Sequence, residues 1–280
     1  LFRSLVDGAT YATSSEDQKG TFFSEGQLNF MGAGILNVTG NNKHAIVSDD
    51  YIYVSEASII VKSAVSDGIH ANDYLAMDNG NITVTAAGGN GIEAEEGYVA
   101  INGGTVTVNS VNDGIAASYD GTDTAITPYV QIKGGKITVT TTGDKGNAIK
   151  SESYTTISTG EAVTLSVSGK GSKGIKTGGD FTLTAGTVKI TTSGAAYYDT
   201  ADSDIAAPAG INCDKNLAIR GGNLTVSSTG SGAKGISVDG TATVSGGTTN
   251  ISATGTKFTY NTSTTSEAKG FKSDGAFTMN

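Results

Sequence analysis

The chain has 280 residues, of which 40 are glycine and two are proline, with no tryptophan and a formal net charge of −9 at pH 7. An acidic chain without a basic run is a poor nucleic-acid binder, because neutralised phosphates supply most of that affinity, and no stretch resembles a transmembrane span. The single cysteine, Cys213, excludes an intrachain disulfide and a cysteine-based zinc site, and we expect it to be a buried thiol.

The composition favours short strands joined by tight turns, because Gly, Thr, Ser and Asn are abundant. Charge is unevenly distributed: residues 1–120 contain 15 acidic and 4 basic side chains, whereas residues 121–280 contain 12 acidic and 14 basic ones. Residues 1–19 precede the regular pattern, and we expect an N-terminal cap or an irregular segment there. Because the chain starts with Leu1 and stops at Asn280 within an apparent strand, we expect a processed or trimmed piece whose signal, if any, is gone.

An apolar residue that opens a strand after a turn recurs along the chain at intervals of 23 to 36 residues. Its positions are Ile46, Ile69, Ile92, Ile115, Ile149, Ile175, Ile211, Ile236 and Phe271. Within a unit, three short strands follow one another, as in DGIHA, YLAM and NITVTA between residues 67 and 86. Each strand alternates inward and outward side chains. Such a period indicates a solenoid of stacked units.

Equivalent inward residues of successive units are expected to stack on one another. They are Met77, Ile101, Ile132 and Ile157 on the second strand, and Val84, Val108, Val139 and Val167 on the third. The pattern predicts a single all-β domain over residues 1–280, a right-handed single-stranded parallel β-helix of about nine to ten coils with three strands per coil.

Three units carry insertions, which lie near residues 119–128, 195–209 and 257–268. The first comes directly after strand one of its coil, and the other two come directly before it. We expect the three loops to flank the strand-one face from opposite sides and to form a groove, because long loops on a rigid scaffold tend to carry function.

Two segments, residues 169–174 and 230–235, match the dinucleotide-binding spacing G-x-G-x-x-G. A dinucleotide loop opens a helix whose N-terminus binds the pyrophosphate, whereas both segments here open a strand. We therefore expect no nucleotide site, and we attribute the glycines to turns that require positive φ.

Acidic and amide side chains form columns that repeat every coil, about 4.8 Å apart. One cluster lies at the end of strand one and another in the turn before it, and a calcium ion needs oxygen ligands at about this spacing. The predicted Ca²⁺ ligands are Asp49, Asp50, Asn72, Asp73, Glu95 and Glu96 in the first cluster, and Asp67, Glu93 and Asp113 in the second. The alternative is solvated turn carboxylates and hydrogen-bonded Asx residues that cap turns.

Lysines replace the acidic residues on the strand-one face of the later coils. Lys150 and Lys176 occupy adjacent coils, and Lys173, Lys234, Lys269 and Lys272 lie near the same line. A row of ammonium groups suits a polymer with regularly spaced carboxylates, such as a polyuronate. The alternative is that these lysines keep a long sheet soluble and prevent edge association.

Tyrosines form a column of their own before strand two of successive coils, at Tyr51, Tyr74, Tyr98, Tyr129 and Tyr154. Stacked tyrosines offer a surface for pyranose rings, although stacking that merely stabilises the solenoid is the alternative we favour. Loop tyrosines have a weaker packing explanation. The candidate carbohydrate-binding residues are therefore Lys150, Lys173, Lys176, Tyr119, Tyr197, Tyr198 and Asn212.

The chain has two histidines, His44 and His70, and neither an H-E-x-x-H nor a G-x-S-x-G motif. The sequence therefore gives no indication of zinc-dependent or serine-hydrolase catalysis. His70 projects outward beside the acidic cluster. We expect it to be a surface residue rather than a ligand.

The early coils resemble a known family in the segments GILNVTGNNKHAIVSDDYIYV, DGIHANDYLAM and NGIEAEEGYVAINGG, residues 34–104. This is the carbohydrate-binding β-helix family first associated with cellulolytic clostridia, whose members have a polysaccharide-lyase-like fold. The resemblance implies a secreted or surface bacterial protein that binds cellulose and acidic sugars such as polygalacturonate, with calcium bound to the helix. The matching positions are Asp49, Asp50, Asn72, Asp73, Asp67 and Asp113. In the later coils Lys-Gly-Ile replaces Asp-Gly-Ile, so the resemblance does not assign the sugar site.

Three functions follow from these patterns. The leading hypothesis is non-catalytic binding of an acidic or cellulosic plant polysaccharide along the strand-one face, in the extracellular space or at the bacterial cell surface. A second is a calcium-dependent polysaccharide lyase in which Lys150 or Lys176 acts as the base. A third is a surface adhesin or structural spacer whose charges only solvate it. The oligomeric state is not predicted.

Overall fold

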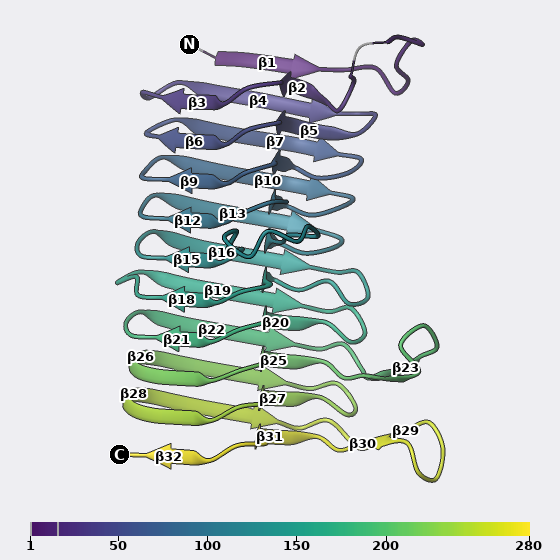
Figure 1. The fold of residues 1–280 in the computed structure, drawn as a ribbon, viewed down its shortest axis with the longest axis vertical. Helices are drawn as coiled ribbons and strands as arrows, with labels where there is room; N and C mark the ends of the chain where they lie inside the picture. Colours follow the sequence, from purple (N-terminus) through teal and green to yellow (C-terminus); the bar gives the residue numbers. More distant parts are fainter. Residues whose placement is uncertain (1, 16) are drawn as a thin grey trace.

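The computed structural model describes residues 2–15 and 17–280, and within them it contains 32 strands and no helix. Most strands pair in parallel with their counterparts one winding away, so the chain forms a tall stack of windings (Figure 1). The prediction of an all-β parallel solenoid is thereby confirmed. The right-handed sense of the winding stays a prediction. No helix in the described part of the chain is long and apolar enough to cross a membrane.

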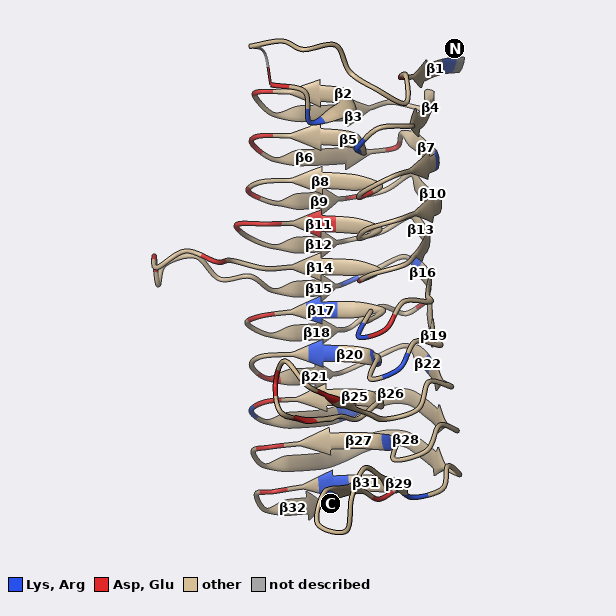
Figure 2. Ribbon diagram, turned by 90° about the vertical axis from the view of Figure 1, so that its right-hand side faces the viewer, with Lys and Arg blue, Asp and Glu red and all other residues tan. Residues whose placement is uncertain are grey.

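The first strands of the windings form a ten-stranded sheet, here called the strand-one sheet (Figure 2). It comprises β2 (Gly20–Ser24), β5 (His44–Ser48), β8 (Ile69–Ala71), β11 (Ile92–Ala94), β14 (Ile115–Ala117), β17 (Ile149–Ser151), β20 (Lys173–Thr177), β25 (Ala209–Cys213), β27 (Lys234–Val238) and β31 (Lys269–Ser273). Of the predicted binding residues, this sheet carries Lys150, Lys173, Lys176 and Asn212.

The other strands of the windings belong to an eighteen-stranded sheet. One series is β3 (Leu28–Met31), β6 (Ile52–Ser55), β9 (Leu75–Met77), β12 (Val99–Ile101), β15 (Val130–Ile132), β18 (Thr155–Ile157), β21 (Phe181–Leu183) and β32 (Phe277–Met279). The other is β1 (Phe2–Val6), β4 (Ile35–Gly40), β7 (Ser58–Ala64), β10 (Asn81–Ala87), β13 (Thr105–Ser110), β16 (Lys136–Thr141), β19 (Ala162–Val167) and β22 (Thr187–Thr192). The long strands β26 (Leu217–Ser228) and β28 (Ala242–Ala253) run through both series and join them.

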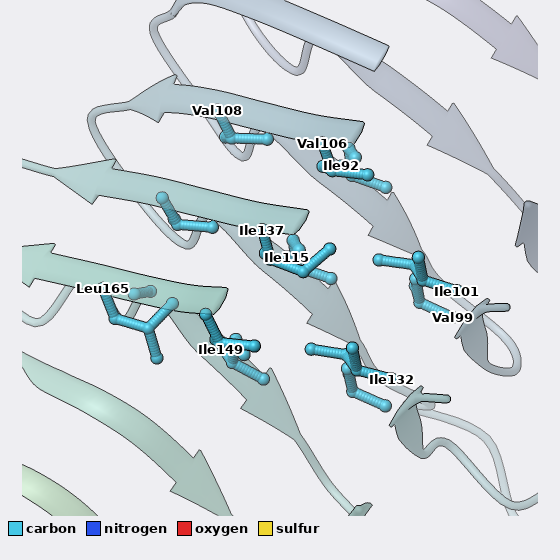
Figure 3. Close-up of a cluster of buried hydrophobic side chains, with 14 of the residues drawn as sticks. Ile92, Val99, Ile101, Val106, Val108, Ile115, Ile132, Ile137, Ile149 and Leu165 are labelled. Carbon is cyan, nitrogen blue, oxygen red and sulfur yellow. The ribbon is translucent and has the colours of Figure 1, made fainter. Parts of the chain in front are cut away.

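The core is a pile of side-chain layers held in register. Ile69, Ile92 and Ile115 are partners in neighbouring windings, and all three are fully buried. Figure 3 shows the same arrangement from Ile92 through Ile115 to Ile149. Because each buried isoleucine contributes about 1.5–3 kcal/mol, every winding is stabilised by the layers on either side of it.

The predicted columns of inward residues on the second and third strands are confirmed by the strand register, with one exception. Met77, Ile101, Ile132 and Ile157 are register partners in succession, as are Val84, Val108 and Val139. The next partner of Val139 is Leu165, so the assignment of Val167 to this column was wrong. Val167 pairs with Thr141 and is buried one step further along the same inward face.

The five tyrosines before strand two form the predicted continuous stack. Neighbouring ring centroids lie 4.7 to 4.8 Å apart and the planes are within 6° of parallel from Tyr51 to Tyr154. This spacing equals the distance of about 4.8 Å between paired strands. Each ring is half-buried, so the stack stabilises the turn between the first two strands of each winding.

The glycine motifs open strands β20 and β27, as expected for turns rather than nucleotide loops. Positive φ is confined to the middle glycine of each motif, Gly171 and Gly232. The last glycine of the first motif, Gly174, is needed for a different reason, because a Cβ there would lie 2.2 Å from Ile190 Cγ2. The attribution of all these glycines to positive φ was therefore wrong.

Two of the insertions fold into small antiparallel hairpins on the same side of the stack, at the right in Figure 1. Residues 195–209 contain β23 (Tyr197–Asp199) paired with β24 (Asp204–Ala206). Residues 257–268 contain β29 (Phe258–Thr259) paired with β30 (Thr265–Ser266). Both hairpins leave the winding just before a strand of the strand-one sheet.

Candidate functional site

A groove of about 950 Å³ lies over the C-terminal windings of the strand-one sheet. Its floor comes from β17, β20, β25, β27 and β31, and the loops at 195–209 and 257–268 contribute to its walls. The lysines that line it are Lys145, Lys150, Lys173, Lys176, Lys234, Lys269 and Lys272. Its acidic lining residues are Asp202, Asp204 and Glu267. We call this feature the lysine groove, and Figure 2 shows its blue segments on β17, β20 and β31.

Two columns of the parallel register place these lysines. Lys173, Ala209, Lys234 and Lys269 are successive partners on one column. Lys150, Lys176, Asn212, Ser237 and Lys272 are successive partners on the other. The prediction that Lys150 and Lys176 occupy adjacent coils is thereby confirmed. Asn212 lies in the middle of the second column and also lines the groove.

The lysines differ in their counter-charges. Lys176 Nζ donates to both carboxylate oxygens of Asp214, at 2.5 and 2.7 Å, and Lys150 Nζ lies 3.8 Å from Asp113 Oδ2. In the described residues, no carboxylate lies within 4.0 Å of the first-column lysines. Those lysines are Lys173, Lys234 and Lys269. This column therefore lacks an ion-pair partner in that part of the chain, and we call it the uncompensated column, although Asp214 and Glu267 act on it at longer range.

Burial and mutual repulsion act on the uncompensated column. Burial, together with the charge of Lys176, lowers the pKa of Lys173 to about 8. Burial and the charge of Lys269 also lower the pKa of Lys234. Both ammonium groups donate to uncharged atoms instead, Lys173 to the Gly171 carbonyl at 2.9 Å and Lys234 to Ser266 Oγ at 2.7 Å. A bound anion would favour the charged form of each.

The two hairpins beside the groove contact each other. Tyr198 of the first stacks on Tyr260 of the second, with centroids 3.8 Å apart and planes 5° from parallel. Lys145 forms ion pairs with Asp199 and Asp202, which ties the first hairpin to the turn before β17. These contacts hold both hairpins beside the floor lysines.

A family model described as carbohydrate-binding domain-containing protein matches the chain over residues 3–169 and again over residues 128–257. The chain belongs to this family. The two matches overlap, as expected for a chain of repeated windings, and the second contains most of the lysine groove. The family supports carbohydrate binding as the function of this chain. No curated protein and no solved structure matches it.

The predicted loop tyrosines of this carbohydrate-binding domain are outside the lysine groove. Tyr197 donates its hydroxyl to Asp199 at 3.3 Å, and Tyr198 takes part in the stack between the hairpins. Tyr119 accepts a hydrogen bond from the amide of Asp123 at 3.0 Å and donates its own amide to Glu152. None of the three lines the groove.

The loop at 119–128 lies at the opposite side of the strand-one sheet from the hairpins, as expected, but it does not line the lysine groove, so the expectation of one groove formed by all three loops was wrong. It lines a separate pocket of about 340 Å³ together with Tyr74, Tyr98 and Tyr129 of the tyrosine stack. In Figure 2 this loop projects from the opposite edge of the strand-one sheet to the hairpins. The reason is its origin after strand one, where the chain turns toward the tyrosines.

The first predicted calcium cluster is partly balanced by the cations of the domain itself. Lys19 Nζ donates to Asp49 at 2.6 Å, and Glu95 lies 3.1 Å from a ring nitrogen of His70. Asn72 is held through its backbone, since its carbonyl accepts from the amide of Glu96 at 2.6 Å. Two members of the cluster, Asp50 and Asp73, remain beside each other without a cationic partner among the described residues. Burial and the hydrogen bond with Asp50 raise the pKa of Asp73.

The second predicted column is a ladder of side-chain to backbone hydrogen bonds, which we call the Asx ladder. Asp67 Oδ1 accepts from the amide of Asn90 at 2.6 Å, and Asn90 Oδ1 accepts from Asp113 at 2.9 Å. Asp113 then accepts from Asn147 at 2.7 Å, and Asn147 from Lys173 at 3.1 Å. The interpretation of these residues as hydrogen-bonded turn caps is confirmed. Binding of Ca²⁺ by Asp67, Glu93 and Asp113 stays a prediction.

Some residues of the site were missed by sequence reasoning. Lys145 lines the groove from a turn and adopts a positive φ of 60°. Its position two residues before Asn147 of the Asx ladder could have placed it beside the groove. Ser266 and Glu267 reach the groove only because their hairpin folds back. His70, which we expected at the surface, is only 9% exposed.

Proposed function

We propose that this carbohydrate-binding domain binds an acidic polysaccharide such as polygalacturonate in the lysine groove without cleaving it. The supporting observation is the column of Lys173, Lys234 and Lys269, which has no carboxylate partner in the described chain. The lysines of the two columns recur at the spacing of the windings, about 4.8 Å or a multiple of it. A polymer with a carboxylate on every sugar can meet several of these ammonium groups at once.

The lining of the groove favours an acidic polymer over cellulose. Neutral pyranose rings are usually held by aromatic faces, and no aromatic side chain is among the lining residues that the structure describes. Cellulose binding therefore remains a second possible outcome of the binding test. Because both polymers occur in plant cell walls, we also propose that the protein acts outside a bacterial cell or on its surface.

A calcium ion is proposed at Asp50 and Asp73. These two carboxylates fit a hard cation, because they lie together, and because burial and the neighbouring Asp50 raise the pKa of Asp73, which a bound cation would offset. Added Ca²⁺ should raise the melting temperature, and Asp73→Asn should remove that increase. An unchanged melting temperature on addition of Ca²⁺ would contradict the calcium site without affecting the lysine groove.

A polysaccharide lyase is the second candidate, and one observation favours it. Lys173 has a pKa of about 8 because it is buried, and a lysine tuned to this range can act as a general base. The lyase bases expected from the sequence, Lys150 and Lys176, lie next to carboxylates instead. Ultraviolet absorbance from unsaturated uronate would reveal this activity. A flat trace across pH with Ca²⁺ present would exclude it.

Retention on immobilised polysaccharides tests the proposed function. The whole chain is passed over polygalacturonate, pectin and cellulose, with Ca²⁺ and separately with a chelator. We expect retention on polygalacturonate that weakens as salt increases, because the contacts are ionic. Elution of the protein with the void volume from all three polymers would overturn the proposal and favour a structural spacer.

A further inference from the structure

A second polar cluster lies on the strand-one face, in windings that precede the lysine groove. His44 begins β5, Asp67 lies in the turn before β8, His70 is on β8 and Glu93 is on β11. We call these four residues the histidine cluster. They come from three consecutive windings, and His70 and Glu93 are register partners. Parallel stacking thus brings His44 beside Asp67 and His70 beside Glu93, and each of these two pairs is separated by 23 positions in the sequence.

One nitrogen of each histidine in the cluster lies close to the same carboxylate oxygen, Asp67 Oδ2. Asp67 Oδ2 lies 3.0 Å from His44 Nδ1 and 3.3 Å from His70 Nδ1. Glu93 Oε2 lies 3.5 Å from the same nitrogen of His70. Among the described residues, His44, Asp67 and His70 form the one group of three or more His, Cys, Asp or Glu side chains whose ligand atoms all lie within 4.8 Å of one another. Ligands of a tetrahedral Zn²⁺ ion, at about 2.0–2.2 Å from the metal, are separated from each other by about 3.3–3.5 Å.

The surrounding hydrogen bonds orient Asp67 and His70 toward a shared ion, whereas His44 Nδ1 accepts the amide of Asp67 at 3.2 Å and would exchange that bond for the metal. The amide of Asn90 donates to Asp67 Oδ1 at 2.6 Å, which leaves Oδ2 directed at the histidines. Glu95 Oε2 lies 3.1 Å from His70 Nε2, so the ring nitrogen opposite Nδ1 donates to a carboxylate. Metal-bound histidines almost always have such a partner on their second nitrogen. Asp67 and His70 are also well buried, at 6% and 9% exposure, so their positions are fixed by packing.

We propose that the histidine cluster binds one divalent transition-metal ion of the zinc class. The ligand atoms are His44 Nδ1, His70 Nδ1 and Asp67 Oδ2, and a water molecule takes the fourth position. Imidazole nitrogens suit Zn²⁺, Cu²⁺ and Ni²⁺, whereas Ca²⁺ takes oxygen ligands. Binding replaces the proton between His70 Nδ1 and the neighbouring carboxylates, and that proton passes to solvent. The ion links two consecutive windings, and its binding does not depend on the lysine groove.

Metal titration of the whole chain tests this proposal. The protein is stripped with a chelator, dialysed, and titrated with Zn²⁺ by calorimetry in buffers of different ionisation enthalpy. We expect one ion per chain and proton release. Titration with Co²⁺ should give the intense visible absorption of four-coordinate cobalt. Zn²⁺ should abolish that absorption, whereas Ca²⁺ should leave it unchanged.

Variants that copy residue types from neighbouring windings separate metal binding from folding. Asp67→Asn and His70→Val introduce the residue types that the chain has at Asn90 and Val47, one winding away on the same columns. Each should lower Zn²⁺ affinity more than about 100-fold, and Glu95→Gln about 10- to 100-fold. Asp180→Asn is the matched control, because Asp180 also accepts a backbone amide, from Asn216, far from the histidines.

Three outcomes would overturn the zinc site. They are the weak absorption of six-coordinate cobalt, displacement of Co²⁺ by Ca²⁺, and unchanged Zn²⁺ affinity in both Asp67→Asn and His70→Val. Circular dichroism of each variant checks that the β-structure is retained. Retention on polygalacturonate is measured in parallel, so failure of the metal site and failure of the lysine groove are distinguished.

Discussion

The two halves of the strand-one face share one scaffold and present opposite charges. On β8 and β11 one outward column carries His70 and Glu93. On β17, β20 and β31 the same column carries Lys150, Lys176 and Lys272, beneath two hairpins (Figure 2). The inward positions hardly change between the halves. In this fold, therefore, the core sets where a side chain is placed, and the outward residue alone sets the chemistry.

The halves also differ in how their charges are compensated. In the first half, Asp49 is paired with Lys19, and Glu95 with His70. In the second half, one lysine column has no carboxylate within 4.0 Å in the described residues. Uncompensated charge in a groove attracts a ligand of the opposite sign. This difference is the physical reason for placing the polyanion on the lysine half.

Comparing the two halves of the strand-one face assumes that core packing contributes equally to stability in both. Ile92→Ala and Ile236→Ala remove fully buried side chains from equivalent layers. Each should reduce the free energy of unfolding by about 2–5 kcal/mol, because a cavity remains in a stacked core. Urea denaturation of the two variants measures this. A cost below about 1 kcal/mol for one of them would show that the halves are not equivalent in packing.

Removing charge from the uncompensated column gives the largest expected effect on binding. The double variant Lys234→Gln with Lys269→Gln keeps polar donors but loses two charges. Each charged contact contributes about 1.5–3 kcal/mol, so affinity for polygalacturonate should fall about 100-fold or more. Calorimetry or retention measures the loss. The matched control is Lys62→Gln with Lys189→Gln, which removes two exposed charges from β7 and β22 and should retain full affinity.

Raising the pH should weaken the lysine half in a defined window. The pKa of Lys173 is about 8 in the fold, against 10.5 for an ordinary lysine, so affinity for polygalacturonate should fall about tenfold as its charge is lost, about 1.4 kcal/mol. In the absence of polysaccharide, the stability of the folded chain should instead increase as the pH is raised. Between pH 8 and 10.5 the unfolded chain binds the proton and the folded chain does not, so the free energy of unfolding rises with pH.

Arginine at the same position provides the control for this pH effect. Lys173→Arg remains charged throughout the window. Its affinity for polygalacturonate should therefore stay constant as the pH is raised. A parallel decline in the original chain and in Lys173→Arg would show that another group controls binding.

The smallest effect is expected from the contact between the hairpins. Tyr260→Ala removes the stack on Tyr198, which contributes about 0.5–1.5 kcal/mol. The released hairpin at 195–209 should be cleaved faster by protease, and affinity should fall only a few-fold. Tyr260→Phe keeps the stacking surface and should behave like the original chain. If Tyr260→Ala were as resistant to protease as the original chain, the contact with Tyr198 would not be what holds the two hairpins together.

Much of the fold could be predicted because equal spacing and alternation determine the register. Ile69, Ile92 and Ile115 lie 23 residues apart, so their stacking followed from the sequence directly. The error at Val167 has a physical origin in the same rule. Leu165 and Val167 both face inward, and a period of two does not distinguish which of them is paired with Val139 when the spacing of the windings changes.

The candidate site could be predicted only in part, because side chains and loops complete it. The lysine columns followed from the register, whereas the hairpin positions depend on contacts such as that between Tyr198 and Tyr260. The burial of His70 was missed because outward residues of a sheet are usually exposed. Here carboxylates from neighbouring windings cover the ring, and only three-dimensional packing reveals this.

The Asx ladder also bears on how such a chain can change its length. Asn90 and Asp113 play the same two parts, each donating an amide to the winding before and accepting one from the winding after. Excision of residues 90–112 would bring Asp113 against Asp67 with the bond restored. Whole turns of the solenoid are thus interchangeable modules, and duplication or loss of one can lengthen or shorten the molecule while the remaining joints stay intact.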